Sequence, residues 1–381
     1  MTMQYVFPTY ARFPFEIVSG KDFTLTDNQG KQYQDFASGI GVCGLGYNNE
    51  ALNKAVIDQV QKVWHTSNLY ESQLQDEVAH LIVKDEDMLV SFCNSGTEAN
   101  EAALKLARKA TGKQNILTFN DSFHGRSYGS LSVTGNAPIK EGFGAMLPGA
   151  IYGTYNDPAA LDLITSELAA VMLEVIQGEG GINVGDPDWL KAVEAKCHQE
   201  GVLLIIDEVQ TGMGRTGELY AFQNYDLHPD IFTLAKCLAN GLPVGAMVGK
   251  KSLAEFFGPG SHGSTFAGNP IAMAAAKVVL ETIDDDFLAC VKKKSEHIWK
   301  EINQQLVGLD AVESVSGKGL MIGIHLTASV PVDEVITKLQ ATGLLTISSK
   351  HNTLRLLPPL ITPCCQLCKG IETIAKVLKT Y

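Results

Sequence analysis

The sequence has 381 residues, 45% of them hydrophobic and 19% charged, which is enough for one large or two medium domains with cores of their own. Lys and Arg number 30 against 42 Asp and Glu, so the formal net charge is −12 and disfavours binding to a nucleic acid or to an anionic membrane. The sequence lacks an uninterrupted apolar run of about 18 residues, and Met1–Phe15 lacks the pattern of a secretion signal. We therefore expect a folded cytoplasmic protein without a membrane span.

The eight cysteines are scattered along the chain, which predicts free thiols in a reducing compartment. Only Cys364, Cys365 and Cys368 lie close together, and they include one C-x-x-C spacing. Because no second pair and no histidine lies near them, the sequence favours the start of the last helix over a metal site. We expect no metal.

The first 36 residues are predicted to form short strands at Phe15–Val18, Phe23–Thr26 and Gln32–Phe36, with Ser19-Gly20 and Asp27–Gly30 as turns. From about Asn49, helical patterns alternate with continuous apolar runs, which are typical of strands buried on both faces. The expected helices are Glu50–Val63, Leu74–Val83, Thr97–Ala110, Pro158–Ser166 and Asp188–Glu200. The expected strands are Leu89–Phe92, Asn115–Phe119, Ala169–Glu174, Val202–Ile206 and Ile231–Thr233. Residues 46–268 are thus predicted to be a large α/β domain with a mostly parallel sheet.

After Gly268 the pattern changes to that of a second, smaller α+β domain, residues 269–381. The first 45 residues are expected to join this domain, because they contribute strands and no βαβ unit. The expected helices are Pro270–Ile283, Phe287–Val307, Val332–Ala341 and Pro363–Leu378, and the expected strands are Val312–Val315, Leu320–His325, Leu344–Ile347 and Leu354–Leu357.

Two charged residues stand out among the apolar strands of the large domain. Asp207 ends the run Val202–Ile206, at the place where open α/β sheets bind ligands. Lys236 is a lone cation in the nearly apolar stretch Ile231–Gly241, and burial lowers the pKa of an amine so that its neutral form can make an imine. Pyridoxal 5'-phosphate needs both groups: a lysine for a Schiff base and an anion at its ring nitrogen. A strand-end Asp can also be a simple helix cap or turn former.

A phosphate site and an aromatic face complete the pattern. Gly96 and Thr97 open a helix whose small first residues and dipole suit an anion, although an ordinary capped helix has the same pattern. If phosphate binds there, Glu98 and Glu101 must point away from it. Phe123 follows a strand three residues before Arg126 and can stack on a ring or belong to the core.

A competing motif is Gly39-Ile-Gly41-Val-Cys-Gly44, which fits the G-x-G-x-x-G pattern of dinucleotide-binding folds. The segment before it is a polar early strand, and no βαβ unit surrounds it. The sequence therefore disfavours NAD binding there.

Taken together, the motifs resemble those of the class III, ornithine-type aminotransferases of fold type I. They occur in that family's order and span about Tyr10 to Leu378. The matching stretches are Asn94–Ala102, Phe123–Arg126, Glu174–Gly181, Asp207–Arg215, Leu234–Lys236 and His262–Thr265. The resemblance implies a mostly parallel seven-stranded sheet in the large domain, and a homodimer with shared active sites.

The resemblance also implies roles for residues at the cofactor. Lys236 carries pyridoxal phosphate and later moves the proton, while Asp207 pairs with the ring nitrogen. Gln210 lies near the ring's phenolic oxygen, and Phe123 stacks on the ring. The remaining implied contacts are Gly96 and Thr97 at the phosphate, Glu208 and Val209 beside Asp207, and Thr265 at the phosphate of the neighbouring subunit.

For the substrates, the resemblance implies that Arg126, with Ser264 nearby, holds the distal carboxylate of the amino donor. Arg355 takes the α-carboxylate of 2-oxoglutarate or glutamate, and Glu179 pairs with Arg355 when the other substrate is bound. A static surface ion pair is the alternative for these last two residues.

The implied reaction moves the terminal amino group of N2-acetyl-L-ornithine to 2-oxoglutarate, giving N-acetyl-L-glutamate 5-semialdehyde and L-glutamate in arginine biosynthesis. The segment Ser38–Val42 lacks a tyrosine associated with ornithine-specific members, which favours the acetylated donor. Ornithine, succinylornithine and 4-aminobutyrate remain alternative donors, and a decarboxylase, an aminomutase or a non-catalytic binding protein on the same fold are further alternatives.

Overall fold

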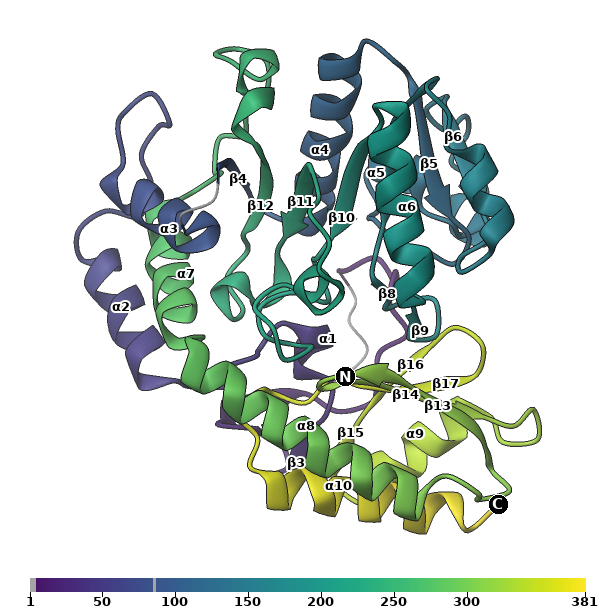
Figure 1. The fold of residues 1–381 in the computed structure, drawn as a ribbon. Coiled ribbons are helices and arrows are strands. Elements are labelled where there is room, and N and C mark those ends of the chain that lie inside the picture. Colours follow the sequence, from purple (N-terminus) through teal and green to yellow (C-terminus); the bar gives the residue numbers. More distant parts are fainter. Residues whose placement is uncertain (1–4, 85–86) are drawn as a thin grey trace.

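The computed structural model describes residues 5–84 and 87–381, which form two packed units (Figure 1). The larger unit contains a sheet with helices on both faces, and the smaller unit lies beneath it in this view. Among the described residues, no helix is both long enough and apolar enough to cross a membrane.

The larger unit is built on a seven-stranded sheet with the strand order β4-β12-β11-β10-β7-β5-β6. Only β12 runs antiparallel to its neighbours; the other strand pairs are parallel. The predicted mostly parallel seven-stranded α/β sheet is confirmed. Its strands are β4 (Met88–Cys93), β5 (Asn115–Phe119), β6 (Ala150–Gly153), β7 (Leu168–Leu173), β10 (Leu203–Asp207), β11 (Ile231–Leu234) and β12 (Gly245–Lys250).

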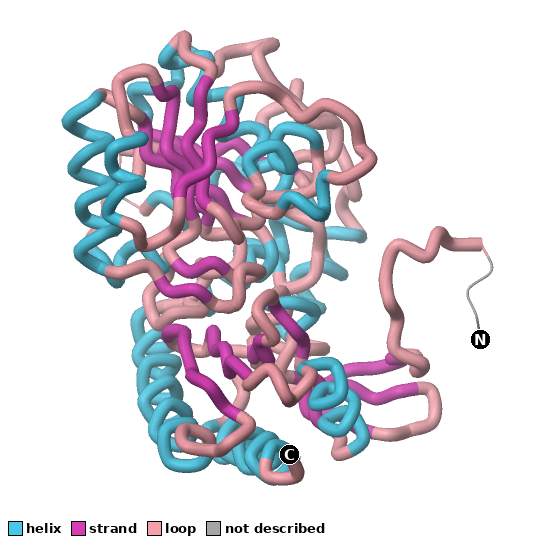
Figure 2. Tube along the Cα trace, turned by 90° about the vertical axis from the view of Figure 1, so that its right-hand side faces the viewer, coloured by secondary structure: helices cyan, strands magenta, loops and turns pink. Residues whose placement is uncertain are grey.

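The two faces of this sheet bury different helices (Figure 2). Ala170 and Met172 of β7 pack in one cluster with α4 (Gly96–Thr111), whereas Val171 and Leu173 pack in another with α6 (Pro187–Glu200) and α7 (Pro270–Thr282). This alternation follows from the two-residue period of a strand. Because both faces of the sheet are buried, its strands appear in the sequence as continuous apolar runs. The remaining helices of this unit are α2 (Glu50–Val60), α3 (Gln73–Val83) and α5 (Tyr128–Val133).

The smaller unit combines segments from both ends of the chain. One sheet has the order β1-β2-β3-β15, and the other β13-β14-β17-β16. Because β15 pairs with β3, residues near position 345 lie beside residues near position 34. We propose on this basis the division into residues 46–268 and a smaller domain made of 1–45, of which 1–4 lie outside the described residues, and 269–381. The elements are β1 (Ile17–Lys21), β2 (Thr24–Asp27), β3 (Gln32–Asp35), α8 (Asp285–Gln305), β13 (Val312–Lys318), β14 (Met321–Leu326), α9 (Val332–Ala341), β15 (Leu344–Leu345), β16 (Ile347–Ser349), β17 (Thr353–Leu356) and α10 (Cys364–Leu378).

Two local predictions were wrong. Ser19-Gly20 lies within β1 rather than in a turn, and a Cβ at Gly20 would come within 2.8 Å of the Tyr47 side chain. That glycine therefore permits close packing, not chain reversal. The predicted helix at Pro158–Ser166 is a 3-10 helix over Pro158–Leu163. The other short elements are α1 (Ser38–Gly41), β8 (Ile176–Gln177), β9 (Asn183–Val184) and the 3-10 helices Ala137–Lys140, Ala221–Tyr225, Lys236–Ala239 and Lys251–Phe256.

Phe36 tests how strongly the N-terminal segment stabilises the smaller unit. Its side chain is fully buried in the core of that unit, and a Cβ on Gly370 of α10 would overlap its ring. We expect Phe36→Ala to lower the free energy of unfolding by about 3–5 kcal/mol in urea denaturation, because the truncation leaves a cavity. Phe143→Ala, at a 57% exposed side chain, is the control with little expected change. Equal stability of the two variants would contradict this packing.

Candidate active site

A cavity of about 410 Å³ lies at the carboxyl ends of β4, β5, β7, β10 and β11. Parallel strands point the same way, so the loops that follow them meet at one edge of the sheet. The cavity is lined by Val42, Asn94–Thr97, Asn100, Phe123–Arg126, Glu174, Asp207, Val209, Gln210, Ala235, Lys236 and Gly241–Val244. Two side chains singled out from the sequence, Asp207 and Lys236, thus lie in one cavity.

Lys236 follows β11 in the left-handed region of backbone conformation, with φ of 43°. A non-glycine residue pays a strain cost in this conformation, and such residues cluster at functional sites. Burial lowers the pKa of the Lys236 amine to about 8, although the carboxylates of Glu179, Asp207 and Glu174 favour its charged form. The neutral fraction near neutral pH is therefore much larger than for an ordinary lysine, and the neutral amine is the nucleophilic form.

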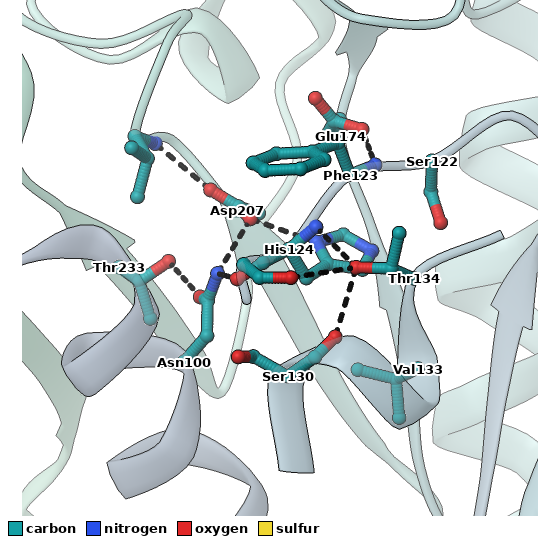
Figure 3. Close-up of polar contacts among 12 residues, drawn as sticks. Asn100, Ser122, Phe123, His124, Ser130, Val133, Thr134, Glu174, Asp207 and Thr233 are labelled. Carbon is teal, nitrogen blue, oxygen red and sulfur yellow. Dashed lines mark hydrogen bonds and ion pairs between the residues drawn. The ribbon is translucent and has the colours of Figure 1, made fainter. Parts of the chain in front are cut away.

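Asp207 is buried at the end of β10 and is held by three donors (Figure 3). Its Oδ2 accepts a hydrogen bond from Asn100 Nδ2 at 2.8 Å and lies 2.7 Å from His124 Nδ1, while its Oδ1 accepts from Val209 N–H at 3.0 Å. A buried carboxylate is costly unless it is paired, and these contacts fix its position and orientation.

Asn100 and His124 were missed in the sequence analysis. Asn100 Nδ2 also donates to His124 O at 2.7 Å, and Asn100 Oδ1 accepts from Thr233 Oγ1 at 2.7 Å, so the amide is fixed at both ends. Asn100 lies one helical turn after Gly96, and this i, i+4 spacing is the sequence signal that places it on the face of α4 that begins at the cavity. His124 carries no such signal, because its partner comes from a distant strand.

The start of α4 forms a backbone cradle beside this carboxylate. A Cβ at Gly96 would come within 2.8 Å of the Val209 side chain, and one at Gly125 would overlap Thr97. Thr97 Oγ1 is 2.5 Å from Ser130 Oγ. Exposed helix N–H groups and hydroxyls in this arrangement suit a phosphate.

The two acidic residues of this helix are bonded to other groups. Glu98 Oε2 accepts from Asn94 N–H at 2.6 Å and from Asn94 Nδ2 at 2.8 Å, and Glu101 Oε1 accepts from Ser130 N–H at 2.8 Å. Neither residue lines the cavity. The requirement that both carboxylates point away from a bound anion is therefore met.

Phe123 and Arg126 both line the cavity, and the Arg126 guanidinium carbon lies 5.8 Å from the centroid of the Phe123 ring. Phe123 is half-buried and Arg126 is exposed. The ring thus forms part of the cavity wall, and the guanidinium is accessible to an incoming anion.

Arg355 reaches the site from β17 of the smaller unit and makes a bidentate pair with Glu179. The distances are 2.5 Å from Nη1 to Oε1 and 3.3 Å from Nη2 to Oε2. Arg355 Nη1 also lies 3.1 Å from Oε1 of the cavity residue Gln210. Burial opposes ionisation of Glu179, but the Arg355 guanidinium outweighs it and lowers the pKa of that carboxyl. With Arg355 only 3% exposed, the pair is no ordinary surface salt bridge.

Ser349 holds the turn Gly178–Gly181, called here the Glu179 turn. Its Oγ is 2.9 Å from the carbonyl oxygens of both Gly178 and Glu179, and it accepts from Gly181 N–H at 3.0 Å. The sequence did not indicate Ser349. Its position shows that the smaller unit fixes both members of the Arg355–Glu179 pair.

Five predicted site residues do not line the cavity: Glu179 and Arg355 contact the cavity residue Gln210, Ser264 contacts the cavity residue Asn94, and Glu208 and Thr265 lie farther out. The Glu208 carboxylate, expected at the cofactor, instead accepts from Ala221 N–H at 3.0 Å, Phe222 N–H at 2.8 Å and Thr211 Oγ1 at 2.8 Å. Ser264 Oγ accepts from Asn94 Nδ2 at 2.8 Å. Thr265 is exposed and does not line the cavity of its own chain.

Comparison with known proteins assigns the family. Residues 5–378 match the aminotransferase class-III family. Similar proteins include an acetylornithine aminotransferase of Lactiplantibacillus plantarum, 59% identical over 100% of this chain and 98% of that protein, and one of Listeria innocua, 52% identical over 99% and 98%. The chain therefore belongs to the class-III aminotransferases. These are pyridoxal 5'-phosphate enzymes, so the chain is a transaminase that depends on this cofactor.

Solved structures agree with this assignment. The ornithine aminotransferase from Toxoplasma gondii ME49 superimposes with a TM-score of 0.95 at 29% identity, covering 99% of this chain and 93% of that one. The N-acetylornithine aminotransferase from Stenotrophomonas maltophilia has a TM-score of 0.84 at 33% identity, with 97% of each chain covered. The expected fold type is confirmed.

Asn100→Asp tests whether the amide at this position sets the charge around Asp207. The near-isosteric change places a second carboxylate where Asn100 Nδ2 now donates at 2.8 Å. Two carboxylates at this distance share a proton, so the negative charge is divided between them and Asp207 pairs less strongly with a protonated ring nitrogen. We expect the dissociation constant for pyridoxal phosphate to rise about tenfold or more, measured by visible absorbance on titrating apo-enzyme. Asn53→Asp, at an exposed amide, is the control, and unchanged affinity of Asn100→Asp would refute the prediction.

Proposed function

We propose that this enzyme transfers the terminal amino group of N2-acetyl-L-ornithine to 2-oxoglutarate, producing N-acetyl-L-glutamate 5-semialdehyde and L-glutamate in arginine biosynthesis. The observation that carries the chemistry is one cavity that contains a strained lysine of lowered pKa and a fully hydrogen-bonded aspartate. The choice of donor is supported by relatives named acetylornithine aminotransferase that share up to 59% of their residues with this chain. A cytoplasmic location belongs to the same proposal.

The cavity residues fit pyridoxal phosphate. The buried anion of Asp207 needs a cationic partner such as a protonated ring nitrogen, and the glycine cradle at Gly96 and Thr97 suits the phosphate. Phe123 offers a ring face, and Gln210 and the backbone of Val209 lie beside Asp207. When bound, this cofactor supplies an aldehyde that Lys236 can hold covalently and a ring that accepts electrons from the reacting carbon.

In this proposal each residue of the chain has a defined task. Lys236 Nζ would hold the cofactor between turnovers and, as a free amine, would accept and then donate the proton of the reacting carbon. Its pKa of about 8 matches this task, because the same group must accept and donate a proton near neutral pH. Asp207 keeps a proton on the ring nitrogen.

Arg355 and Glu179 let one site accept two different substrates. The planar guanidinium forms a bidentate pair with the α-carboxylate of 2-oxoglutarate once Glu179 moves aside. Glu179 pairs with Arg355 at 2.5 Å in the structure, and the same pairing would cover the bare charge when the donor presents its methylene chain. Arg126 is accessible from solvent and, with Ser264, takes the distal carboxylate of the donor.

A homodimer is part of the same proposal. Thr265 is exposed in its own chain, so it is free to reach the phosphate in a neighbouring subunit. The N-terminal segment before β1 extends away from the smaller unit and carries exposed aromatic side chains (Figure 2). Exposed apolar groups of this kind mark protein–protein interfaces, and a second copy of the chain would cover them.

Free ornithine is the second candidate donor, because an ornithine aminotransferase has a TM-score of 0.95 with this chain. The apolar Val42 lines the cavity and offers no hydrogen bond to the charged α-amino group of ornithine. It therefore favours the acetylated donor.

Half-reaction kinetics test the proposed function. Loss of the visible absorbance of the cofactor is followed after mixing the enzyme with N2-acetylornithine, ornithine, succinylornithine or 4-aminobutyrate in turn. We expect the highest kcat/KM with N2-acetylornithine, and no absorbance change or turnover in Lys236→Ala, which lacks the amine that moves the proton. Equal or better turnover of ornithine would overturn the choice of donor, and full activity of Lys236→Ala would overturn the mechanism.

A further inference from the structure

Glu174 connects two loops of the site that are far apart in sequence. It follows β7, lines the cavity and is only 5% exposed. Its Oε2 accepts from Phe123 N–H at 3.1 Å, and its Oε1 accepts from Gly178 N–H at 3.2 Å (Figure 3 shows the first bond). One carboxylate thus contacts both the loop that carries Phe123 and the start of the Glu179 turn.

The charge of this carboxylate is costly to the fold. Burial raises the pKa of Glu174 to about 7; His124 favours the ionised form and Asp207 disfavours it. The Lys236 amine interacts with it across the cavity, and Tyr155 donates to its backbone carbonyl at 2.7 Å. Because the pKa is raised in the folded state, stability is fully present below the unfolded pKa of about 4.3 and is lost as the pH rises through about 7. An ionised Glu174 therefore lowers the stability of the fold.

We propose that Glu174 is a positioning residue for transamination, whose two carboxylate oxygens hold the Phe123 loop and the Glu179 turn at a fixed spacing. The inference rests on the proposed roles of Phe123 at the ring and Glu179 at Arg355. This positioning role explains why a carboxylate is present where its ionisation lowers the stability of the fold. Only an ionised carboxylate offers an acceptor oxygen free of hydrogen to each N–H.

Two substitutions distinguish the effect of the length of the Glu174 side chain from the effect of its charge. In Glu174→Gln, one of the two N–H groups faces an amide NH₂ instead of an acceptor, and the loop on that side loosens. In Glu174→Asp the charge stays, but the side chain is one methylene shorter and does not span both loops. Glu194→Gln is a matched control, because Glu194 also accepts a backbone N–H, that of His228, but lies on α6 outside the cavity.

The test is the ratio of kcat/KM between wild-type holoenzyme and each variant, measured from pH 6 to pH 9 with the best amino donor and 2-oxoglutarate. For Glu174→Gln we expect the ratio to be lowest at pH 6 and to rise to about tenfold at pH 9, because the Glu174 carboxyl, whose pKa is raised by burial, ionises as the pH rises. Because Lys236 also interacts with the charge of Glu174, Glu174→Gln changes the titration of that amine as well, whereas Glu174→Asp keeps the charge and tests the two-loop contact alone. Glu174→Asp is expected to lose about tenfold at pH 9, and Glu194→Gln to keep a ratio near 1 throughout.

Stability and cofactor affinity complete the test. Thermal unfolding of Glu174→Gln at pH 9 is expected to match or exceed that of the wild type, because the buried charge is gone. A pH-independent ratio for Glu174→Gln, or a loss of activity that follows a loss of stability, would overturn the positioning role. If no donor converts the bound cofactor, the proposed function fails. The positioning role is then still tested by the dissociation constants for pyridoxal phosphate of Glu174→Gln and the wild type, whose ratio is expected to rise with pH.

Discussion

The buried carboxylate of Asp207 at the end of β10 is the constraint on which the rest of the site depends. Its charge lies in the interior of the larger unit and is stabilised by Asn100 from α4, His124 from the loop after β5, and the backbone N–H of Val209. Each donor comes from a separate element, so one anion ties together α4, which begins with Gly96 and Thr97, and the loop that carries Phe123. Hydrogen bonds offset part of the cost of burial, and a cationic ring nitrogen would offset the remainder.

The substrate side of the site depends on how the two units pack. Arg355 comes from β17 of the smaller unit and Glu179 from a loop of the larger unit, and Ser349 of the smaller unit fixes the Glu179 turn. Both members of the Arg355–Glu179 pair therefore depend on the smaller unit, whereas Asp207 and Lys236 follow strands of the larger unit. In the proposed function, the groups that carry the chemistry follow strands of the larger unit, and the choice between substrates depends on the contact between the units.

The sequence predicted those features of the fold and the site that depend on a residue type and on its neighbours in the chain. Apolar runs, one of them ending in Asp207, indicated the sheet, and the lone Lys236 and the small residues at Gly96 indicated groups that the structure places in one cavity, without any knowledge of distant contacts. His124 and Glu174 were missed because their importance lies in bonds to residues 83 and 51 positions away, which no local pattern encodes. Glu208 shows the converse: it adjoins Asp207 in sequence, but successive side chains at a strand end point in opposite directions, so its carboxylate bonds to residues 221 and 222.

The protonation state of the ring nitrogen tests the role of Asp207 most directly. Nitrogen-15 NMR of holoenzyme loaded with ring-labelled pyridoxal phosphate distinguishes a protonated from an unprotonated ring nitrogen, in the wild type and in Asp207→Asn. The account predicts a protonated nitrogen in the wild type up to at least pH 8 and an unprotonated one in the variant. An unprotonated nitrogen in the wild type, or the same signal in both proteins, would contradict it.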